Sequence, residues 1–164
     1  MVCVMSFHVR RKDREIIDYA VLKEVLQSTK YVTVALCMGD EPYLVSLSHG
    51  YDEACNCLYF HCSDEGKKLV YLKANSKVWG QAVEDYGVTD ECDYAYKSVH
   101  FKGSMSLIND LKEKQHAMEV LVRQLSATPE EKMAKVNPEK LVRTTMGKIN
   151  IAYMSGKQHQ RPNP

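Results

Sequence analysis

The chain has 164 residues, 45% of them hydrophobic and 26% charged, and its formal net charge is +1. This length suits one domain with one core. The nearly balanced charge offers no field that would favour nucleic acid or a membrane surface as a partner. No apolar run approaches the roughly 20 residues of a membrane-spanning helix.

The start of the chain has no features of a secretory signal peptide, because Arg10 and Arg11 follow the first apolar run instead of preceding it. We therefore expect a cytoplasmic protein. The six cysteines could form disulfides, but in a cytoplasmic chain of this size reduced thiols are expected. They are Cys3, Cys37, Cys55, Cys57, Cys62 and Cys92.

The first predicted element is a helix over about residues 13–28, with apolar residues at helical spacing and Asp13 as its N-terminal cap. Six strands follow from apolar and alternating patterns. They are expected at residues 31–38, 43–51, 57–62, 78–84, 97–107 and 147–154.

Alternation defines the faces of several of these strands. Leu44, Ser46 and Ser48 share one face of the second strand. Val45, Leu47 and His49 share the opposite, largely apolar face. In the last strand one face is expected to carry Ile149, Ile151 and Tyr153.

The connections complete the predicted domain. Residues 85–96 are acidic and aromatic and are predicted to form a loop over a site or an interface. Helices are expected over residues 110–126, after a capping box at 128–131, and from Asn137. One domain should span residues 1–157, and residues 158–164 should form a disordered tail.

Six strands joined mostly by short turns predict a mainly β fold, a small antiparallel barrel with helices packed outside. The connections are too short for a doubly wound parallel sheet. The sequence also has no GxGxxG or Walker lysine motif, so the common nucleotide-binding folds are not expected.

The corner between the third strand and the next helix is the best candidate for binding chemistry. We expect that helix to open on Ser63, with Gly66, Lys67 and Lys68 in its first turns. Backbone N–H groups, a hydroxyl and ammonium groups would then meet at one place, which suits a phosphate. A solvated helix start remains open as an alternative, with Ser63 as its cap.

Two other clusters have weaker signals. Cys55, Cys57, Cys62, His49 and His61 could supply soft ligands to zinc or an iron–sulfur cluster. Their spacing is not the usual one, and His61 and Cys62 point to opposite faces of a strand, so no metal is expected.

On the fifth strand Ser98, His100 and Lys102 share one polar face. This face could be wet, or it could line a ligand cleft.

Four segments in order resemble the FMN-binding split-barrel family related to pyridoxamine 5′-phosphate oxidase, and especially its nitroimidazole-resistance (Nim-like) branch. The segments are RRKDREI (Arg10–Ile16), EPYLVSLSHGY (Glu41–Tyr51), LYFHCSDEGKKL (Leu58–Leu69) with NSKV (Asn75–Val78), and YKSVHFKGSM (Tyr96–Met105).

The resemblance implies a six-stranded antiparallel split β-barrel with peripheral helices, and a homodimer with FMN at the subunit interface. It assigns flavin and ribityl contacts to one strand and the phosphate to the corner. The implied cofactor-binding residues are Val45, Ser46, Leu47, Ser48, His61, Cys62, Ser63, Lys67, Lys68 and Ser98.

The function implied is that of a flavoprotein oxidoreductase, passing electrons from a reduced donor to a small organic acceptor such as a nitroaromatic compound. His61 is the residue expected nearest the reacting atoms. Asp64 and Glu65 replace paired basic residues of the oxidase, so pyridoxine phosphate is not the expected substrate. A flavin carrier without turnover, or a related barrel that binds haem, are the alternatives.

Overall fold

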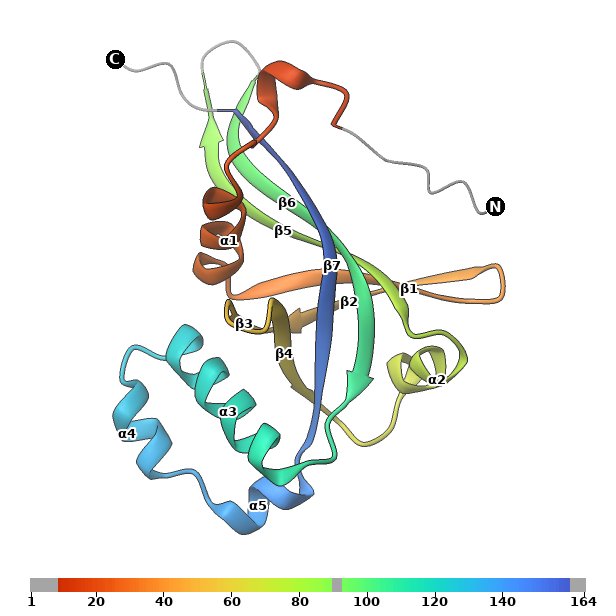
Figure 1. Ribbon diagram of the computed structural model, residues 1–164, viewed down its shortest axis with the longest axis vertical. Helices are drawn as coiled ribbons and strands as arrows, with labels where there is room; N and C mark the ends of the chain where they lie inside the picture. The colour runs from red at the N-terminus through yellow and green to blue at the C-terminus, as the bar shows by residue number, and fades with distance from the viewer. Residues whose placement is uncertain (1–8, 90–92, 160–164) are drawn as a thin grey trace.

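The computed structural model describes residues 9–89 and 93–159 and consists of one antiparallel sheet with helices around it (Figure 1). The strands are β1 (Tyr31–Met38), β2 (Glu41–Ser48), β3 (Gly50–Asp52), β4 (Cys57–Cys62), β5 (Lys77–Val88), β6 (Tyr94–Leu107) and β7 (Thr145–His159). The helices are η1 (Lys12–Arg14), α1 (Tyr19–Ser28), α2 (Lys67–Ala74), α3 (Leu111–Leu125), α4 (Pro129–Ala134) and α5 (Pro138–Arg143).

The sheet has seven strands in the order β2-β1-β5-β6-β7-β4-β3. The predicted mainly β, antiparallel architecture is confirmed, but the number of strands is not six, because β3 follows β2 as a separate short strand. The two ends of the sheet approach one another without pairing, since β2 and β4 come within 8 Å between Cα atoms. The sheet therefore curves strongly but is not closed.

The N-terminal helix differs from its prediction. Asp13 lies in η1 and pairs with Arg11 (2.8 Å), and the α-helix begins only after Asp18, whose side chain accepts a hydrogen bond from the backbone N–H of Ala20. The reason is a tertiary contact between this segment and β7. Ile16 is buried, and its N–H donates to the carbonyl of Gly156 (3.0 Å), which keeps this segment extended along β7.

The loop predicted over residues 85–96 is mostly strand. Asp85 pairs with Tyr96, and Val88 pairs with Tyr94, with a register shift between them at Gly87, whose φ is 85°. Pairing extends the β5–β6 hairpin to a short tip, of which residues 90–92 lie outside the described residues. The acidic, aromatic composition was therefore a poor guide to backbone conformation here.

The face assignment of the last strand is also wrong, because a β-bulge changes the alternation. Lys102 pairs with Tyr153, but Gly103 pairs with Ile151, so β7 has one extra residue at this point. Ile149 and Ile151 share one face, as predicted, and are buried there, whereas Tyr153 is 36% exposed on the opposite face. The strand also runs on to His159, so residues 158 and 159 of the predicted tail are strand, and residues 160–164 lie outside the described part.

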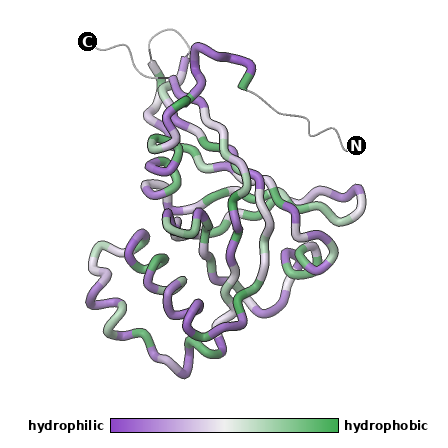
Figure 2. Tube along the Cα trace, viewed as in Figure 1, coloured by the Kyte–Doolittle hydropathy of each residue, from purple (hydrophilic) through white to green (hydrophobic). Residues whose placement is uncertain are grey.

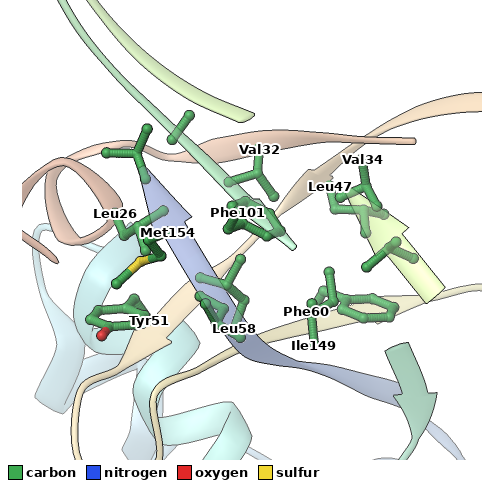
Figure 3. Packing of buried hydrophobic residues seen from close by; sticks show 14 of the residues in the cluster. Leu26, Val32, Val34, Leu47, Tyr51, Leu58, Phe60, Phe101, Ile149 and Met154 are labelled. Carbon is green, nitrogen blue, oxygen red and sulfur yellow. The ribbon is translucent and has the colours of Figure 1, made fainter. Parts of the chain in front are cut away.

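The main hydrophobic core fills the concave side of the sheet under α1 (Figure 3). Its largest fully buried residues include Phe60, Phe101, Leu58 and Ile149. They come from β4, β6 and β7, so strands from both halves of the chain build one core. Helix α1 closes one end with Val25 and Leu26, which are fully buried.

The three C-terminal helices form a separate layer on β3 and β4. The predicted helices are confirmed, and α3 shows the expected alternation of hydrophobic and hydrophilic stretches (Figure 2). Asn137 caps α5 as expected, but the predicted capping box at Thr128 is wrong, since no side chain caps α4. Ala117 and Leu121 bury α3 against Tyr59 in a second, smaller cluster.

None of the helices in residues 9–89 and 93–159 is both long and apolar enough to cross a membrane.

A half-buried side chain, that of Gln124, joins α3 to the end of α1 and to β3. The side-chain amide of Gln124 donates to the carbonyls of Leu26 (2.9 Å) and Thr29 (2.8 Å), and its oxygen accepts from the N–H of Tyr51 (2.8 Å). His49 is fully buried beside it, and its Nε2 lies 2.8 Å from the Leu26 carbonyl. The His49 Nδ1 has no hydrogen-bond partner among the described residues.

This histidine predicts a pH dependence of stability. Burial lowers the pKa of His49, and its hydrogen bond to Leu26 compensates only in part. The unfolded chain should bind this proton near the ordinary pKa of about 6.5. The free energy of unfolding should therefore fall as the pH drops below about 6.5, because the unfolded state then binds more protons.

Urea unfolding of wild-type protein and His49→Gln at about pH 7.5 and about pH 5.5 checks this prediction. The loss of stability at the lower pH should be smaller in His49→Gln, since the neutral amide has no proton to take up. His61→Gln, which removes an exposed imidazole, is the matched control and should keep the wild-type loss. Equal losses in His49→Gln and wild type would contradict the prediction.

Candidate functional site

The corner after β4 is built differently from the prediction. Residues 64–66 form a bend, and α2 begins at Lys67 with Gly66 as its N-terminal cap residue. The prediction that the helix opens on Ser63 is therefore wrong. Gly66 has a φ of 124°, a backbone conformation that residues with a side chain rarely adopt. An added Cβ atom would meet no other atom within 4 Å, so backbone conformation and not space favours glycine here. The chain can turn into the helix at this position because the residue is glycine.

The N-terminus of α2 has free hydrogen-bond donors. No side chain caps it in the described part of the chain, and the Gly66 carbonyl accepts the N–H groups of Leu69 and Val70. The N–H groups of Lys67 and Lys68 are thus left without an intrahelical partner, at the positive end of the helix. Ser63 is exposed directly before the bend that leads into the helix. This arrangement fits an anion with several oxygen atoms, such as a phosphate.

Lys67 directs its ammonium group toward β2. The Nζ atom lies 4.9 Å from the ring centre of Tyr43 on β2 and 5.3 Å from that of Tyr71 on α2. The two tyrosine rings pack against each other at 5.1 Å. The ammonium group therefore lies close to two aromatic rings near the corner, on a side chain that is exposed overall. Lys68 is half-buried on the same turn.

Strand β2 forms one edge of the sheet, so half of its backbone groups have no strand partner. The N–H of His49 donates to the carbonyl of Lys30 (3.3 Å), which sets the phase of the pairing with β1. Alternate residues of an antiparallel pair point their backbone groups toward and away from the partner. Those of Ser46 and Ser48 consequently point to the open edge, and their side chains are exposed.

Val45 and Leu47 have the opposite orientation. Leu47 is 5% exposed within the main core (Figure 3). The backbone groups of both residues point toward β1, and Val45 packs against that core. Their contacts with a ligand remain a prediction. The geometry favours Ser46 and Ser48, which offer both hydroxyl and backbone groups.

His61 and Cys62 end β4 with their side chains on opposite faces, as predicted. His61 is exposed, whereas Cys62 packs against the main core. The cluster of sulfur and imidazole groups considered for a metal is not assembled, because His49 is buried against the Leu26 carbonyl. In residues 9–89 and 93–159 no group of three or more potential ligands could hold a metal ion. Of the cysteines, those described are free thiols: Cys37, Cys55, Cys57 and Cys62.

Ser98 lies on the convex face of the sheet and is largely buried, and its contact with a cofactor remains a prediction. It is 8% exposed, and its hydroxyl is 3.5 Å from the Lys157 carbonyl. Ser98 on β6 is also far from β2, because strands β1 and β5 lie between β2 and β6 in the sheet. The structure therefore does not bring Ser98 next to Ser46 and Ser48 within one chain.

One row of polar residues across this face was missed. Thr33 pairs with both Ser46 and Gln81, and Gln81 pairs with His100. The sequence shows that each residue faces the polar side of its own strand, but only the register places them in one row. They extend the polar surface of Ser46 from the edge strand to the middle of the sheet.

The protein belongs to the pyridoxamine 5′-phosphate oxidase family, since the model of the family described by that name matches residues 18–158. The resemblance seen in the sequence is thereby confirmed. A comparison with curated protein sequences gave no match.

Several solved structures have the same fold. A candidate 5-nitroimidazole antibiotic resistance protein from Bacteroides thetaiotaomicron matches with a TM-score of 0.74 and 22% identity, over 87% of this chain and 85% of that chain. The flavocytochrome Anf3 from Azotobacter vinelandii matches with a TM-score of 0.78 and 20% identity, over 94% and 74% of the two chains. A FAD-binding protein from Mesorhizobium loti matches with a TM-score of 0.65 and 24% identity, over 90% of this chain and 98% of that chain. At these identities the likeness shows the fold alone.

Proposed function

We propose that this protein binds FMN and is an oxidoreductase that passes electrons from a reduced donor to a small organic acceptor. The observation that carries the proposal is the uncapped N-terminus of α2, with Lys67 beside it and the open edge of β2 nearby. FMN combines an anionic phosphate, a polar ribityl chain and a flat ring system. The corner and the strand edge offer matching groups for the first two.

The proposed contacts follow from this geometry. The N–H groups of Lys67 and Lys68, the Lys67 ammonium and the Ser63 hydroxyl would hold the phosphate. Ser46 and Ser48 would bind the ribityl and ring atoms through hydroxyl and backbone groups. These charge-assisted and neutral hydrogen bonds would fix the position of the ligand.

A bound flavin supplies the redox chemistry itself, while the protein positions it and tunes it by hydrogen bonds. His61 is the proposed protein group nearest the reacting atoms, because it is exposed at the end of β4 directly before the corner. It could hold or transfer a proton at the imidazole. The names of the similar structures, a flavocytochrome and a FAD-binding protein, support a flavin.

Two alternatives remain. A flavin carrier would bind FMN without turnover, and a haem-binding protein would bind a different flat cofactor. The second is favoured by one observation, since a similar structure from Mycobacterium smegmatis is a FAD- and haem-binding protein (TM-score 0.75, 17% identity, over 92% of this chain and 76% of that chain).

Absorbance of the purified protein and mass spectrometry of the ligand released on denaturation test the proposal. FMN bands and mass are the expected result, and NADH- or NADPH-dependent reduction of a nitroimidazole would support the oxidoreductase over the carrier. A haem Soret band would favour the haem alternative. A colourless protein that fails to bind added FMN would contradict flavin binding altogether.

We further propose that the protein is a homodimer that covers the convex face of the sheet and encloses FMN at the interface. This face is unusually apolar for a solvent-facing surface. Its exposed large hydrophobic residues are Tyr31, Leu44, Trp79, Val83 and Tyr153. A second copy would bury them and could bring the polar residues of β6 to the cofactor, which a single chain does not.

Substituting Val83, which is 47% exposed on this face, should therefore shift the protein toward a monomer. In Val83→Glu an unpaired carboxylate would have to be buried in the interface, which costs several kcal/mol. Sedimentation velocity across a concentration series measures the shift. Val142→Glu, on the exposed side of α5, is the control and should sediment like wild type. A monomeric wild-type protein, or an unchanged dimer in Val83→Glu, would contradict this assembly.

A further inference from the structure

A pocket lies within the layer formed by α3, α4 and α5, which Figure 1 shows together at one end of the molecule, well apart from α2. Its volume is about 380 Å³, within the range of small-molecule sites. All of its lining residues come from the three helices and the turn between α4 and α5. The pocket is therefore distinct from the α2 corner, from the edge of β2 and from the strands of the proposed dimer face.

One wall of the pocket is a stripe along α3. Its four residues line the pocket, and their spacing places them on one side of the helix: Gln115, His116, Met118 and Glu119. The Glu119 carboxylate is already engaged, since its Oε1 accepts two hydrogen bonds from Arg123 (3.0 and 2.8 Å). Gln115 and His116 are thus the polar groups that this wall offers to a ligand.

The opposite wall is apolar. Met133 belongs to α4, Val136 to the turn after it and Pro138 to the start of α5. The N–H of Val136 donates to the Met133 carbonyl (3.0 Å), which brings these two residues together. Leu141 is 3% exposed and packs in the same cluster as Met118. Thioether side chains adapt to the shape of a ligand and make favourable contacts with aromatic rings, so these walls suit a flat apolar ring.

A buried carboxylate orients His116. The Nε2 atom of this half-exposed imidazole lies 2.5 Å from Oδ2 of Asp52, whose side chain is 8% exposed. Oδ1 of Asp52 accepts from the backbone N–H groups of Ala54 (3.0 Å) and Cys55 (3.4 Å), so the carboxylate is itself held in place. The imidazole also meets the ring of Tyr59 edge to face, with centroids 5.7 Å apart. The imidazole is thereby fixed at the pocket.

The contact with Asp52 decides which ring nitrogen is left for a ligand. A carboxylate can only accept, so Nε2 of His116 carries a proton. Nδ1 has no hydrogen-bond partner within residues 9–89 and 93–159. A ligand hydroxyl donates to Nδ1 of the neutral ring and accepts from Nδ1–H of the charged ring, so it matches both states. An ammonium or a carboxylate would match only one of them.

We infer that this pocket is a binding site for a small hydroxylated aromatic compound, such as a phenol or a naphthol. The aromatic ring would pack between Met118 and Met133. The hydroxyl would form a hydrogen bond with Nδ1 of His116, and the side-chain amide of Gln115 would be a second polar contact. This site does not require flavin, so it can fail or succeed independently of the proposed function.

Two ligands of similar size, 1-naphthol and 1-methylnaphthalene, test the site because only the first has a hydroxyl. We would titrate each into the full-length protein by calorimetry and follow the isotope-labelled methionine methyl groups by NMR. The expected result is saturable binding of one 1-naphthol per chain with shifts of the Met118 and Met133 resonances, which leucine variants assign. A lack of saturable binding, or binding that leaves both resonances in place, would overturn the inference.

The hydrogen bond to His116 is tested by His116→Phe, which keeps an aromatic ring beside Tyr59. This change should weaken 1-naphthol binding about two- to tenfold, the effect of one neutral hydrogen bond, without weakening 1-methylnaphthalene binding. The matched control is His159→Phe, which removes an imidazole that also contacts an aspartate, Asp93 (3.0 Å), at the far end of β7. It should bind both compounds like wild type. Equal losses for the two compounds in His116→Phe, or the same loss in His159→Phe, would contradict the assignment.

The apolar wall gives a second test that keeps the contact between Asp52 and His116. Met133→Ala removes apolar surface from the pocket and should weaken both compounds about three- to tenfold. Lys132→Ala, at the neighbouring position outside the pocket lining, is its control and should bind like wild type. Wild-type affinity for both compounds in Met133→Ala would place the ligand elsewhere and would overturn the site.

A final measurement separates this pocket from the flavin corner. The calorimetric titration of 1-naphthol is repeated with saturating FMN, and its affinity should not change. Competition by FMN would show that 1-naphthol binds at the flavin site and would overturn the inference. If FMN does not bind at all, the flavin proposal fails while the pocket is still tested by the two naphthalene compounds.

Discussion

Replacing Lys67 with alanine should weaken FMN binding by about 10- to 100-fold, the effect of losing a charge-assisted hydrogen bond of about 1.5–3 kcal/mol. The reason is the position of this ammonium group, 4.9 Å from the ring centre of Tyr43 and beside the uncapped N-terminus of α2. The cation and the free N–H groups would bind the same phosphate. Fluorescence titration of the apoprotein with FMN measures the change.

The design includes a matched variant and a matched ligand. Lys73→Ala removes the same side chain from the last turn of the same helix, and it should leave FMN affinity within about twofold of wild type. Riboflavin lacks the phosphate, so Lys67→Ala should affect riboflavin binding little. A Lys67→Ala protein that still prefers FMN to riboflavin as strongly as wild type would show that the phosphate binds elsewhere.

Gly103→Ala should lower the free energy of unfolding by about 2–4 kcal/mol, at the upper end of typical single substitutions. A Cβ at this position would lie 2.1 Å from the backbone carbonyl oxygen of Asn150. A backbone atom cannot move aside like a flexible side chain, so β6 and β7 would have to separate at the bulge. Urea denaturation followed by circular dichroism measures the change.

The effect should also reach the convex face of the sheet. Loss of the bulge would move Tyr153 away from Trp79, and the tryptophan emission of folded Gly103→Ala should therefore differ from that of wild type. Ser104→Ala changes the adjacent residue without a clash and should stay within about 0.5 kcal/mol of wild type. A Gly103→Ala protein with wild-type stability and emission would mean that this close approach does not constrain the fold.

Much of the candidate site could be predicted locally. The alternation in β2 correctly placed Ser46 and Ser48 outside and Leu47 inside, because the face on which a strand residue lies depends only on its position in the strand. The corner with Gly66 and Lys67 was found from residue type and spacing. The start of its helix was misplaced because Ser63 is also a good cap, and local preference alone cannot choose between the two starts.

The sequence by itself determined six of the seven described strands, most of the helices, most of the polar faces and the family, since all of these rest on local periodicity or on motifs in a fixed order. Tertiary structure decided the rest. Contact with β7 kept the segment around Ile16 extended, pairing converted the 85–96 loop into strand, and a bulge turned Tyr153 outward. Register between distant strands has no local signal, so the row of Ser46, Thr33, Gln81 and His100 exists only in the folded chain.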